Sequence, residues 1–473
     1  MNNIIDMNNN QINLNYIGFL SVVAAIGGFL FGYDTAVISG TIAQVTTQYG
    51  LDNVSQGWYV GCALVGSILG VTCGGYLGDR FGRRKMLFIS AVLFSVSALY
   101  CMLSSDFQQL IYARIIGGIG IGVVSIISPM YISELAVPQY RGRLVSLYQL
   151  AVTIGFLGAY IVNYLLMQYA IGDAQNLQGE WLRLIFYQEV WRGMLGISGL
   201  PAVFFFLIIF FIPESPRWLV RHGRSEKAHD IFRRIYGSES AAKTELNKIQ
   251  DASSKEKKVD WKLLAQPGVR KAVWIGAAIA ILGQFMGVNA VLYYGPTIFE
   301  SSGISGGDSL FYQVIVGLVN VLTTVLAVFI IDKIGRKKLV YLGVSGMIVF
   351  LLLIGVYFLW GKVLGLPSLF MLSCFLAYVF CCAISISAVI WVLLSEMYPN
   401  SIRGLAMSIA GLSLWLGTYL VGQLTPWLLD NLSPGGTFFL FAAMCVPYML
   451  IVWKLVPETT GRSLEDIERH WIH

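Results

Sequence analysis

Charged side chains are scarce in this sequence, making up only 12% of its 473 residues, about half of the roughly 25% found in an ordinary soluble protein. Hydrophobic residues make up 56%, and residues 86–103 and 339–361 contain no charge at all. Such runs predict transmembrane helices, because about 20 helical residues cross the hydrocarbon of a bilayer. A β-barrel would instead show alternating segments of about 10 residues. The sequence therefore excludes a soluble enzyme, a nucleic-acid-binding domain and a β-barrel.

Side chains that hold metals or activate nucleophiles are also few. The four histidines lie outside the apolar runs, and the seven cysteines lie inside them without forming a Cys-x-x-Cys pair, so the cysteines are interpreted as small buried hydrophobes. No Gly-x-x-x-x-Gly-Lys-[Ser/Thr] loop occurs, so ATP does not drive this protein. We expect no metal site, no cofactor and, because no nucleophile–base pair can be assembled, no enzymatic activity.

The apolar runs divide into twelve predicted transmembrane helices, so the predicted fold class is an all-α membrane protein. Helices suit this environment because each one satisfies its own backbone hydrogen bonds, as lipid requires. The predicted spans are residues 16–42, 57–78, 86–104, 109–132, 143–168, 190–212, 271–299, 308–331, 339–360, 367–394, 404–428 and 436–456.

Basic residues are distributed unevenly between the predicted loops. If both termini are cytoplasmic, the outer loops hold only Arg183, Arg192 and Lys362, Arg114 lies within a span, and every other Lys and Arg lies on the cytoplasmic side. This is the positive-inside pattern of membrane proteins. It predicts a multi-pass protein of the plasma (cell inner) membrane with both termini in the cytoplasm. The net charge of +6 then results from the basic residues of the cytoplasmic loops, and no nucleic-acid partner is expected.

The longest polar stretch, residues 214–269, separates the spans into two sets of six whose ends repeat each other. The motif at residues 78–85 returns at 332–338, the Ser-Glu at 133–134 returns at 395–396, and the Pro-Glu at 213–214 returns at 457–458. Three repeated motifs in the same order indicate a duplicated six-helix unit with a central site between its halves. The predicted division is an N-terminal half (1–213), a cytoplasmic helical linker (214–269), a C-terminal half (270–456) and a cytoplasmic tail (457–473).

These motifs, together with the Phe-Gly-Tyr-Asp sequence at residues 31–34, resemble the sugar porter family of the major facilitator superfamily from about Gly27 to Glu465. Residues 28–40 and 292–296 are most similar to bacterial proton–xylose (pentose or hexose) symporters. The resemblance implies the major facilitator fold. It also implies a monomeric secondary active transporter in the lipid bilayer, which imports a monosaccharide such as xylose or glucose with a proton by alternating access.

Asp34 and Arg114 are charged residues well inside predicted spans. An ionised Asp there costs on the order of 3 kcal/mol on insertion scales, so it is a functional candidate by default. Helical depth places both residues in the outer half of the membrane, where an approaching or withdrawing Arg would change the protonation of the Asp. A static buried ion pair is the alternative. The resemblance implies that Asp34 couples the proton and that Arg114 is its partner.

Amide and aromatic side chains near the middle of the spans are candidates for binding a sugar, because amides match pairs of hydroxyls and rings cover the C–H face. Amides within spans can instead join helices to one another. Two amides that the family uses are replaced here by Gly283 and Leu414, so the identity of the sugar is not carried over. The resemblance implies the substrate-binding residues Gln149, Gln284, Asn289, Tyr293, Asn320, Trp391 and Trp415.

The charged residues of the repeated motifs lie at the cytoplasmic ends of the predicted spans. Opposite charges on the two halves could hold the inner side closed, as in the family, or they could act only as a topology signal. The expected cytoplasmic gate residues are Asp79, Arg83, Glu134, Arg141 and Glu214 in the first half, and Asp332, Arg336, Glu396, Arg403 and Glu458 in the second.

Two other functions stay open at this point. An uncoupled facilitative sugar transporter would have the same fold, but facilitators of the family usually carry a neutral residue at the position of Asp34. A membrane sugar sensor usually carries a long cytoplasmic tail, whereas about twenty residues follow the last predicted span here.

Overall fold

A computed structural model describes residues 12–172, 174, 177–254, 266–398 and 402–458. These residues form helices and no β-strand, and twelve helical segments among them are long and apolar enough to cross a membrane. The predicted all-α class and the twelve spans are therefore confirmed.

The first six spans are followed by three short helices. Asp52 and Asp106 begin two of these spans by accepting the backbone N–H groups of Ser55 and Gln109, both at 2.9 Å, which satisfies donors that a helix start leaves free. The elements are α1 (Leu14–Val37), η1 (Ile38–Gly40), α2 (Ile42–Tyr49), α3 (Asn53–Phe81), α4 (Arg83–Leu103), α5 (Phe107–Leu135), α6 (Arg141–Ile171), α7 (Glu180–Arg183), η3 (Leu184–Gln188), α8 (Val190–Ile197), α9 (Gly199–Ile208), η4 (Ile209–Phe211), α10 (Pro216–Arg221), α11 (Ser225–Tyr236) and α12 (Glu239–Ser254).

The last six spans repeat this pattern. Gly82 and Gly335 occupy matching positions just before the third span of each half, and both have a positive φ, 103° and 95°, a conformation that favours glycine. The elements are α14 (Pro267–Phe285), α15 (Val288–Ser301), α16 (Gly306–Ile334), α17 (Arg336–Trp360), α18 (Ser368–Cys382), η5 (Ala383–Ser387), α19 (Ala388–Met397), α20 (Arg403–Asn431) and α21 (Ser433–Leu455).

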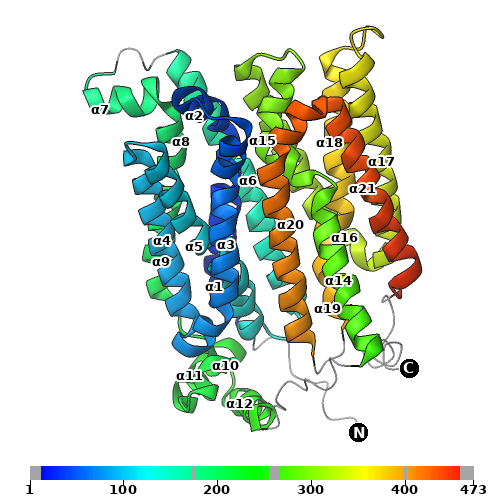
Figure 1. Cartoon of the computed structure of the whole chain (residues 1–473). Coiled ribbons are helices and arrows are strands. Elements are labelled where there is room, and N and C mark those ends of the chain that lie inside the picture. Colours follow the sequence, from blue (N-terminus) through cyan, green and yellow to red (C-terminus); the bar gives the residue numbers. More distant parts are fainter. Residues whose placement is uncertain (1–11, 173, 175–176, 255–265, 399–401, 459–473) are drawn as a thin grey trace.

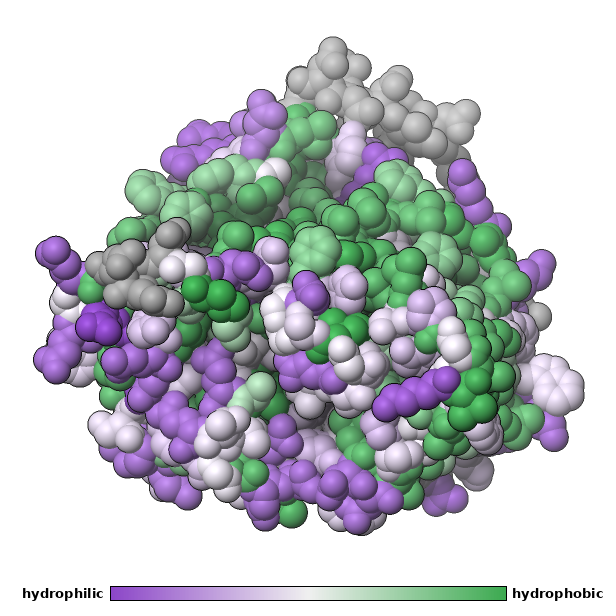
Figure 2. All heavy atoms as spheres, turned by 90° about the horizontal axis from the view of Figure 1, so that it is seen from above, coloured by the Kyte–Doolittle hydropathy of each residue, from purple (hydrophilic) through white to green (hydrophobic). Residues whose placement is uncertain are grey.

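The two ends of the helix bundle differ. Figure 1 shows α2 and α7 at one end, which we call the α2 end, and α10–α12 at the other, which we call the linker end. The backbone N–H of Asn13 donates to the carbonyl of Ile235 in α11 at 2.9 Å, so the first described residues also lie at the linker end. Figure 2 looks onto the α2 end, where hydrophilic side chains gather beside apolar ones.

Three spans that the sequence predicts as continuous are interrupted. The seventh is divided between α14 and α15 at Gly287, whose φ is 89° and where a side chain would collide with Phe441. The carbonyl of Met286 beside this break accepts a hydrogen bond from the Tyr378 hydroxyl at 2.7 Å, which replaces the lost helical bond. The sixth span is divided at Ser198, and the tenth contains the π-helical turn η5.

Glycines let neighbouring helices of the first half approach closely. A methyl group at Gly32 of α1 would collide with the Val152 carbonyl of α6, and one at Gly70 of α3 would collide with the Ile119 carbonyl of α5. Small residues at such crossings allow van der Waals packing, which drives helix association in lipid. Gly75, also on α3, has nothing within 4 Å of the position of a methyl group, so it does not take part in a crossing.

Gly70→Ala is expected to destabilise the protein by about 1–3 kcal/mol, because α3 and α5 must move apart to admit the methyl group. The measurement is the thermal unfolding midpoint in detergent. Gly75→Ala is the matched control on the same helix, and it should leave the midpoint unchanged or slightly raised, since alanine favours a helix over glycine. Equal midpoints for the two variants would contradict the packing argument.

Candidate functional site

The two halves are held together at the α2 end. The Asn53 amide of α3 donates to the Asp430 carboxylate of α20 at 2.7 Å, and the Gln423 amide donates to the Val54 carbonyl at 3.0 Å. On the other side of the bundle, the Tyr160 hydroxyl of α6 donates to the Leu292 carbonyl of α15 at 2.9 Å. These hydrogen bonds join the first and second halves of the protein at the α2 end.

Two prolines explain where the tyrosine hydroxyls bind. Pro296 has no N–H to donate to the carbonyl four residues earlier, which is that of Leu292, and Tyr160 binds it from the other half. Pro426 likewise frees the Gly422 carbonyl, which accepts from the Tyr294 hydroxyl at 2.6 Å. The sequence reasoning missed Tyr160, although the prolines inside predicted spans were a usable signal that two carbonyls would need partners.

Gln313 of α16 is a further residue that the sequence reasoning missed. Its side chain is buried, and its Nε2 donates to the Leu292 carbonyl at 3.1 Å. The carbonyl that Pro296 frees therefore accepts from both halves, because Tyr160 belongs to the first and Gln313 to the second. An amide inside a predicted span was the signal that could have found Gln313.

Asp34 and Arg114 form an ion pair in the interior of the first half. The Nη1 of Arg114 lies 3.1 Å from Oδ1 of Asp34, and both Nη atoms lie 3.3 Å from the Asp34 carbonyl oxygen. Asp34 lies in the last turn of α1, where carbonyls have no helical donor, so Arg114 satisfies the backbone and the side chain together. The side chains of Asp34 and Arg114 are nearly inaccessible, with relative exposures of 9% and 2%. Oδ2 of Asp34 has no hydrogen-bond partner among the described residues.

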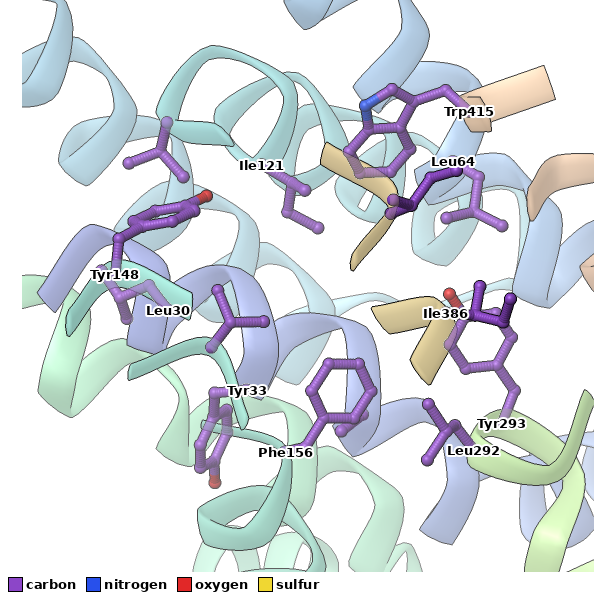
Figure 3. Packing of buried hydrophobic residues seen from close by; sticks show 14 of the residues in the cluster. Leu30, Tyr33, Leu64, Ile121, Tyr148, Phe156, Leu292, Tyr293, Ile386 and Trp415 are labelled. Carbon is purple, nitrogen blue, oxygen red and sulfur yellow. The ribbon is translucent and has the colours of Figure 1, made fainter. Parts of the chain in front are cut away.

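Tyr293 of α15 connects this pair to the second half. It is buried, and together with Arg114 and Thr35 it lines a cavity of about 10 Å³, a space close to the size of one water molecule. Figure 3 shows Tyr293 and Trp415 of the second half near Leu64 and Ile121 of the first. The predicted proton pair and the predicted sugar wall therefore lie next to each other.

Three of the predicted sugar-binding residues are brought together around the break in the seventh span. Oε1 of Gln284 accepts the Asn289 amide at 2.7 Å and the Thr418 hydroxyl at 3.2 Å. Trp415 lies one turn before Thr418 on α20, and its ring centroid is 5.7 Å from that of Phe31 on α1. Thr418 was not predicted, and its position three residues after Trp415 was the available signal.

The other predicted sugar-binding residues are less closely grouped. Gln149 on α6 is half-buried and Asn320 on α16 is buried, and within the described chain neither side chain hydrogen-bonds to the Gln284 group. Trp391 on α19 is 40% exposed and faces Gly411 of α20.

The two positions that depart from the family have different surroundings. Gly283 is buried, and a methyl group on it would lie 3.7 Å from both Ile386 and Tyr448, which is ordinary contact. A longer side chain there would therefore meet these two neighbours. Leu414 on α20 is half-buried.

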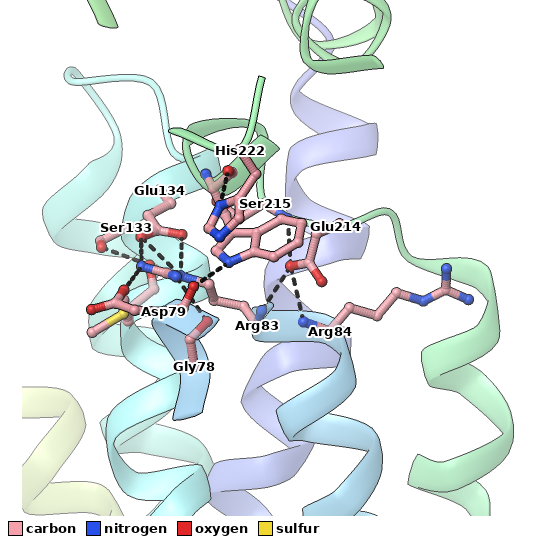
Figure 4. Close-up of polar contacts among 11 residues, drawn as sticks. Gly78, Asp79, Arg83, Arg84, Ser133, Glu134, Glu214, Ser215 and His222 are labelled. Atoms are coloured by element: carbon pink, nitrogen blue, oxygen red, sulfur yellow. Dashed lines mark hydrogen bonds and ion pairs between the residues drawn. The ribbon is translucent and has the colours of Figure 1, made fainter. Parts of the chain in front are cut away.

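Four of the five predicted gate residues of the first half form one cluster at the linker end, shown in Figure 4, and they are Asp79, Arg83, Glu134 and Glu214. The Arg83 guanidinium contacts Glu134 at 2.9 Å and Asp79 at 2.8 Å.

Oε1 of Glu214 accepts the backbone N–H groups of Arg83, Arg84 and Ser215 at 2.8–3.0 Å, so it caps α4, whose own cap position is a glycine. Burial raises the pKa of the Glu214 carboxyl, and these three N–H groups oppose that shift. Arg141 begins α6.

The gate residues of the second half follow a similar plan. Arg336 contacts Glu396 at 3.1 Å, and Arg403 donates to the Tyr398 carbonyl at 3.3 Å. Glu458 is the last described residue, and the side chain of Asp332 lies outside the described part. The ion pairs found here, like those of Arg83, join partners in the same half. The expected clamp between opposite halves stays a prediction.

The chain is similar to known proteins over nearly its whole length. The family model described as "Sugar (and other) transporter" matches residues 20–471. The chain belongs to the sugar transporter family. Its relatives include the arabinose-proton symporter of Bacillus subtilis, 39% identical over 97% of this chain and 96% of the relative. They also include the D-xylose-proton symporter of Escherichia coli K12, 38% identical over 98% and 97%.

Solved structures of the E. coli xylose transporter XylE have the same fold. The inward open conformation superposes with a TM-score of 0.82 at 36% identity, covering 96% of this chain and 100% of XylE. The form bound to 6-bromo-6-deoxy-D-glucose superposes with a TM-score of 0.78 at 37% identity, covering 97% and 100%.

Tyr160→Phe is expected to weaken closure of the α2 end, because it removes the hydroxyl that joins the halves at the Leu292 carbonyl. Loss of one buried hydrogen bond costs about 1 kcal/mol net, which is roughly a fivefold change in a conformational equilibrium. Spin labels at the exposed positions Val54 and Leu432 should report a larger population with separated halves in pulsed electron resonance.

The control for this experiment is Tyr294→Phe. It removes a hydroxyl–carbonyl bond of the same kind, but within the second half, so the label distances should stay as in the unmodified protein. An equal change in both variants, or no change in Tyr160→Phe, would show that the bond does not hold the halves together.

Proposed function

We propose that this protein imports a monosaccharide, a pentose or hexose such as xylose or glucose, together with a proton by alternating access. The observation that carries the proposal is the buried Asp34–Arg114 pair, which lies against Tyr293 at the junction of the two halves. The similarity to proton-coupled arabinose and xylose symporters over nearly the whole chain supports it.

Asp34 carries the proton in this proposal. Its Oδ1 is bound to Arg114 while its Oδ2 has no partner among the described residues, so a proton can be added without breaking another bond. A carboxylate that loses its guanidinium in a low-dielectric interior leaves an unpaired charge, which costs several kcal/mol. Separation from Arg114 is therefore accompanied by proton uptake, and renewed pairing by proton release.

The sugar binds between the halves at the Gln284 group. Asn289 and Thr418 donate to Gln284 in this structure, and sugar hydroxyls can replace these partners because an amide both donates and accepts. Trp415, Tyr293 and Trp391 cover the apolar face of the sugar ring. Gln149 and Asn320 complete the site from α6 and α16 when the halves move.

The topology follows from the same scheme. The linker end is cytoplasmic, in agreement with the positive-inside bias, and this structure is therefore closed toward the outside. The protein works as a monomer in the plasma (cell inner) membrane, and it is a transporter rather than an enzyme. Its units are residues 1–213, 214–269, 270–456 and 457–473, and the ten predicted gate residues control the cytoplasmic side.

Asp34→Asn is expected to abolish accumulation of sugar under a pH gradient while leaving sugar exchange partly active. An amide keeps the shape of the side chain but cannot take up and release a proton. The measurement is uptake of labelled xylose, arabinose and glucose into proteoliposomes, with and without a pH gradient, beside counterflow without one. This experiment also separates the symporter from an uncoupled facilitator, which would ignore the gradient, and from a sensor, which would transport nothing.

The control for coupling is Asp106→Asn. Asp106 caps α5 at the α2 end, and asparagine caps a helix about as well as aspartate, so coupled uptake should persist. If the Asp34→Asn protein still concentrates sugar under a pH gradient, Asp34 is not the coupling residue.

Gln284→Ala is expected to weaken sugar binding by about 1–3 kcal/mol, because it strands hydroxyl groups that the amide satisfies. Isothermal titration of the purified protein measures this change, with Gln109→Ala at the N-terminal end of α5 as the control. Unchanged affinity in Gln284→Ala, Asn289→Ala, Gln149→Ala and Trp391→Ala would place the sugar elsewhere.

A further inference from the structure

A second cavity, which opens widely at the surface, lies at the α2 end, away from the junction of the halves. Its volume is about 890 Å³, and its walls come from α2, the end of α6, η3 and the start of α8, all in the first half. None of its lining residues belongs to the Gln284 group or to the Asp34–Arg114 pair. It is therefore a separate space with its own chemistry.

Two glutamines of α2 line this cavity with a defined orientation. Gln44 and Gln48 lie one helical turn apart, so they share a face of α2. Oε1 of Gln44 accepts the backbone N–H of Trp191 at 3.0 Å, and Oε1 of Gln48 accepts the Trp191 ring N–H at 2.7 Å. With both oxygens held by one residue, each amide keeps its NH₂ group as the remaining donor.

One of these donors has no partner in the structure. The Nε2 of Gln44 is buried without a hydrogen bond among the described residues, and a buried unpaired donor costs about 1–3 kcal/mol. This nitrogen has almost no accessible surface, so the donor that the cavity exposes is the NH₂ group of Gln48, which is an exposed residue of the lining. The side chain of Gln188 also lines this space, and so does the Thr47 hydroxyl, which donates to the Ala43 carbonyl at 2.8 Å and can therefore accept a hydrogen bond from a ligand hydroxyl.

The charges of the walls indicate a neutral ligand. Glu189 is the acidic residue of the lining, and it pairs with Arg192. Arg192 is buried, donates to the carbonyls of Met102 and Ser104, and stacks on Trp191 at 4.4 Å. No Lys or Arg is among the described lining residues, so a phosphate or carboxylate would find no free cation here.

The remaining walls are apolar. Met167, Ala170, Ile171 and Val190 form one side, and Tyr187 adds an aromatic ring. A sugar presents both kinds of surface, with hydroxyls for amide donors and C–H faces for apolar and aromatic walls. We propose that this cavity binds a neutral carbohydrate, a mono- or disaccharide, as a second site at the α2 end that is separate from the transport site.

Equilibrium dialysis of the full-length protein in detergent tests this proposal, with labelled xylose, arabinose, glucose and maltose as probes. The unmodified protein should bind one of these sugars at two sites per chain. Gln284→Ala combined with Asn289→Ala should remove one site and leave the other. Further addition of Gln44→Glu and Gln48→Glu should weaken the second site at least tenfold.

The glutamate variants change only the donors. Glutamate keeps an oxygen for each Trp191 contact and loses the NH₂ group, and Gln56→Glu makes the same change on α3 outside the lining. If the paired glutamate variant unfolds, Thr47→Val removes a hydroxyl from the same wall of α2 and should still weaken the second site. Three results would overturn the proposal. One is that each of the four sugars binds at one site or at none. The others are a second-site affinity that Gln44→Glu, Gln48→Glu and Thr47→Val all leave unchanged, and a co-purifying lipid in a protein that binds no sugar there.

The outcome is independent of the transport proposal. If the central site is misplaced, Gln284→Ala and Asn289→Ala fail to remove a site, while the glutamate variants still do. If the second site is wrong, the glutamate variants fail while proton-driven uptake still depends on Asp34.

Discussion

Every backbone polar group that lies in hydrocarbon needs a hydrogen-bond partner inside the protein, and this constraint accounts for the irregular parts of the structure as well as the regular ones. Most of the chain meets it with uninterrupted helices. Where a helix ends or loses a donor, a side chain from another helix takes over. The carbonyls of Met286, Leu292, Gly422 and Asp34 accept from Tyr378, Tyr160, Tyr294 and Arg114, respectively.

These replacement hydrogen bonds lie at the irregular positions, next to the residues for which a function is proposed. A carbonyl freed by a proline can change partners at the cost of a single hydrogen bond, about 1 kcal/mol net, whereas opening a regular helix costs several. The seventh span is divided at Gly287 and carries Pro296, so α15 can move against the first half. The predicted sugar ligands Gln284 and Asn289 lie on either side of that division, where such a movement would change their separation.

In the functions proposed above, amide side chains serve two purposes, and their neighbours decide which. The oxygen of Gln284 accepts from groups that a ligand can replace, close to the junction of the halves. The oxygens of Gln44 and Gln48 are held by Trp191, so only their NH₂ groups remain for a ligand. The same residue type therefore gives an exchangeable group at the centre and an oriented pair of donors at the α2 end.

Composition and pattern determined the number of spans, the duplicated halves and the candidate pair of Asp34 and Arg114, because hydropathy, repeated motifs and intramembrane charge are local properties of the chain. The tertiary structure decided which freed carbonyl Tyr160 would reach, how Trp191 would orient Gln44 and Gln48, and which end of the bundle would be closed. Those outcomes depend on contacts between helices far apart in sequence, and the hydropathy pattern is the same whichever end is open.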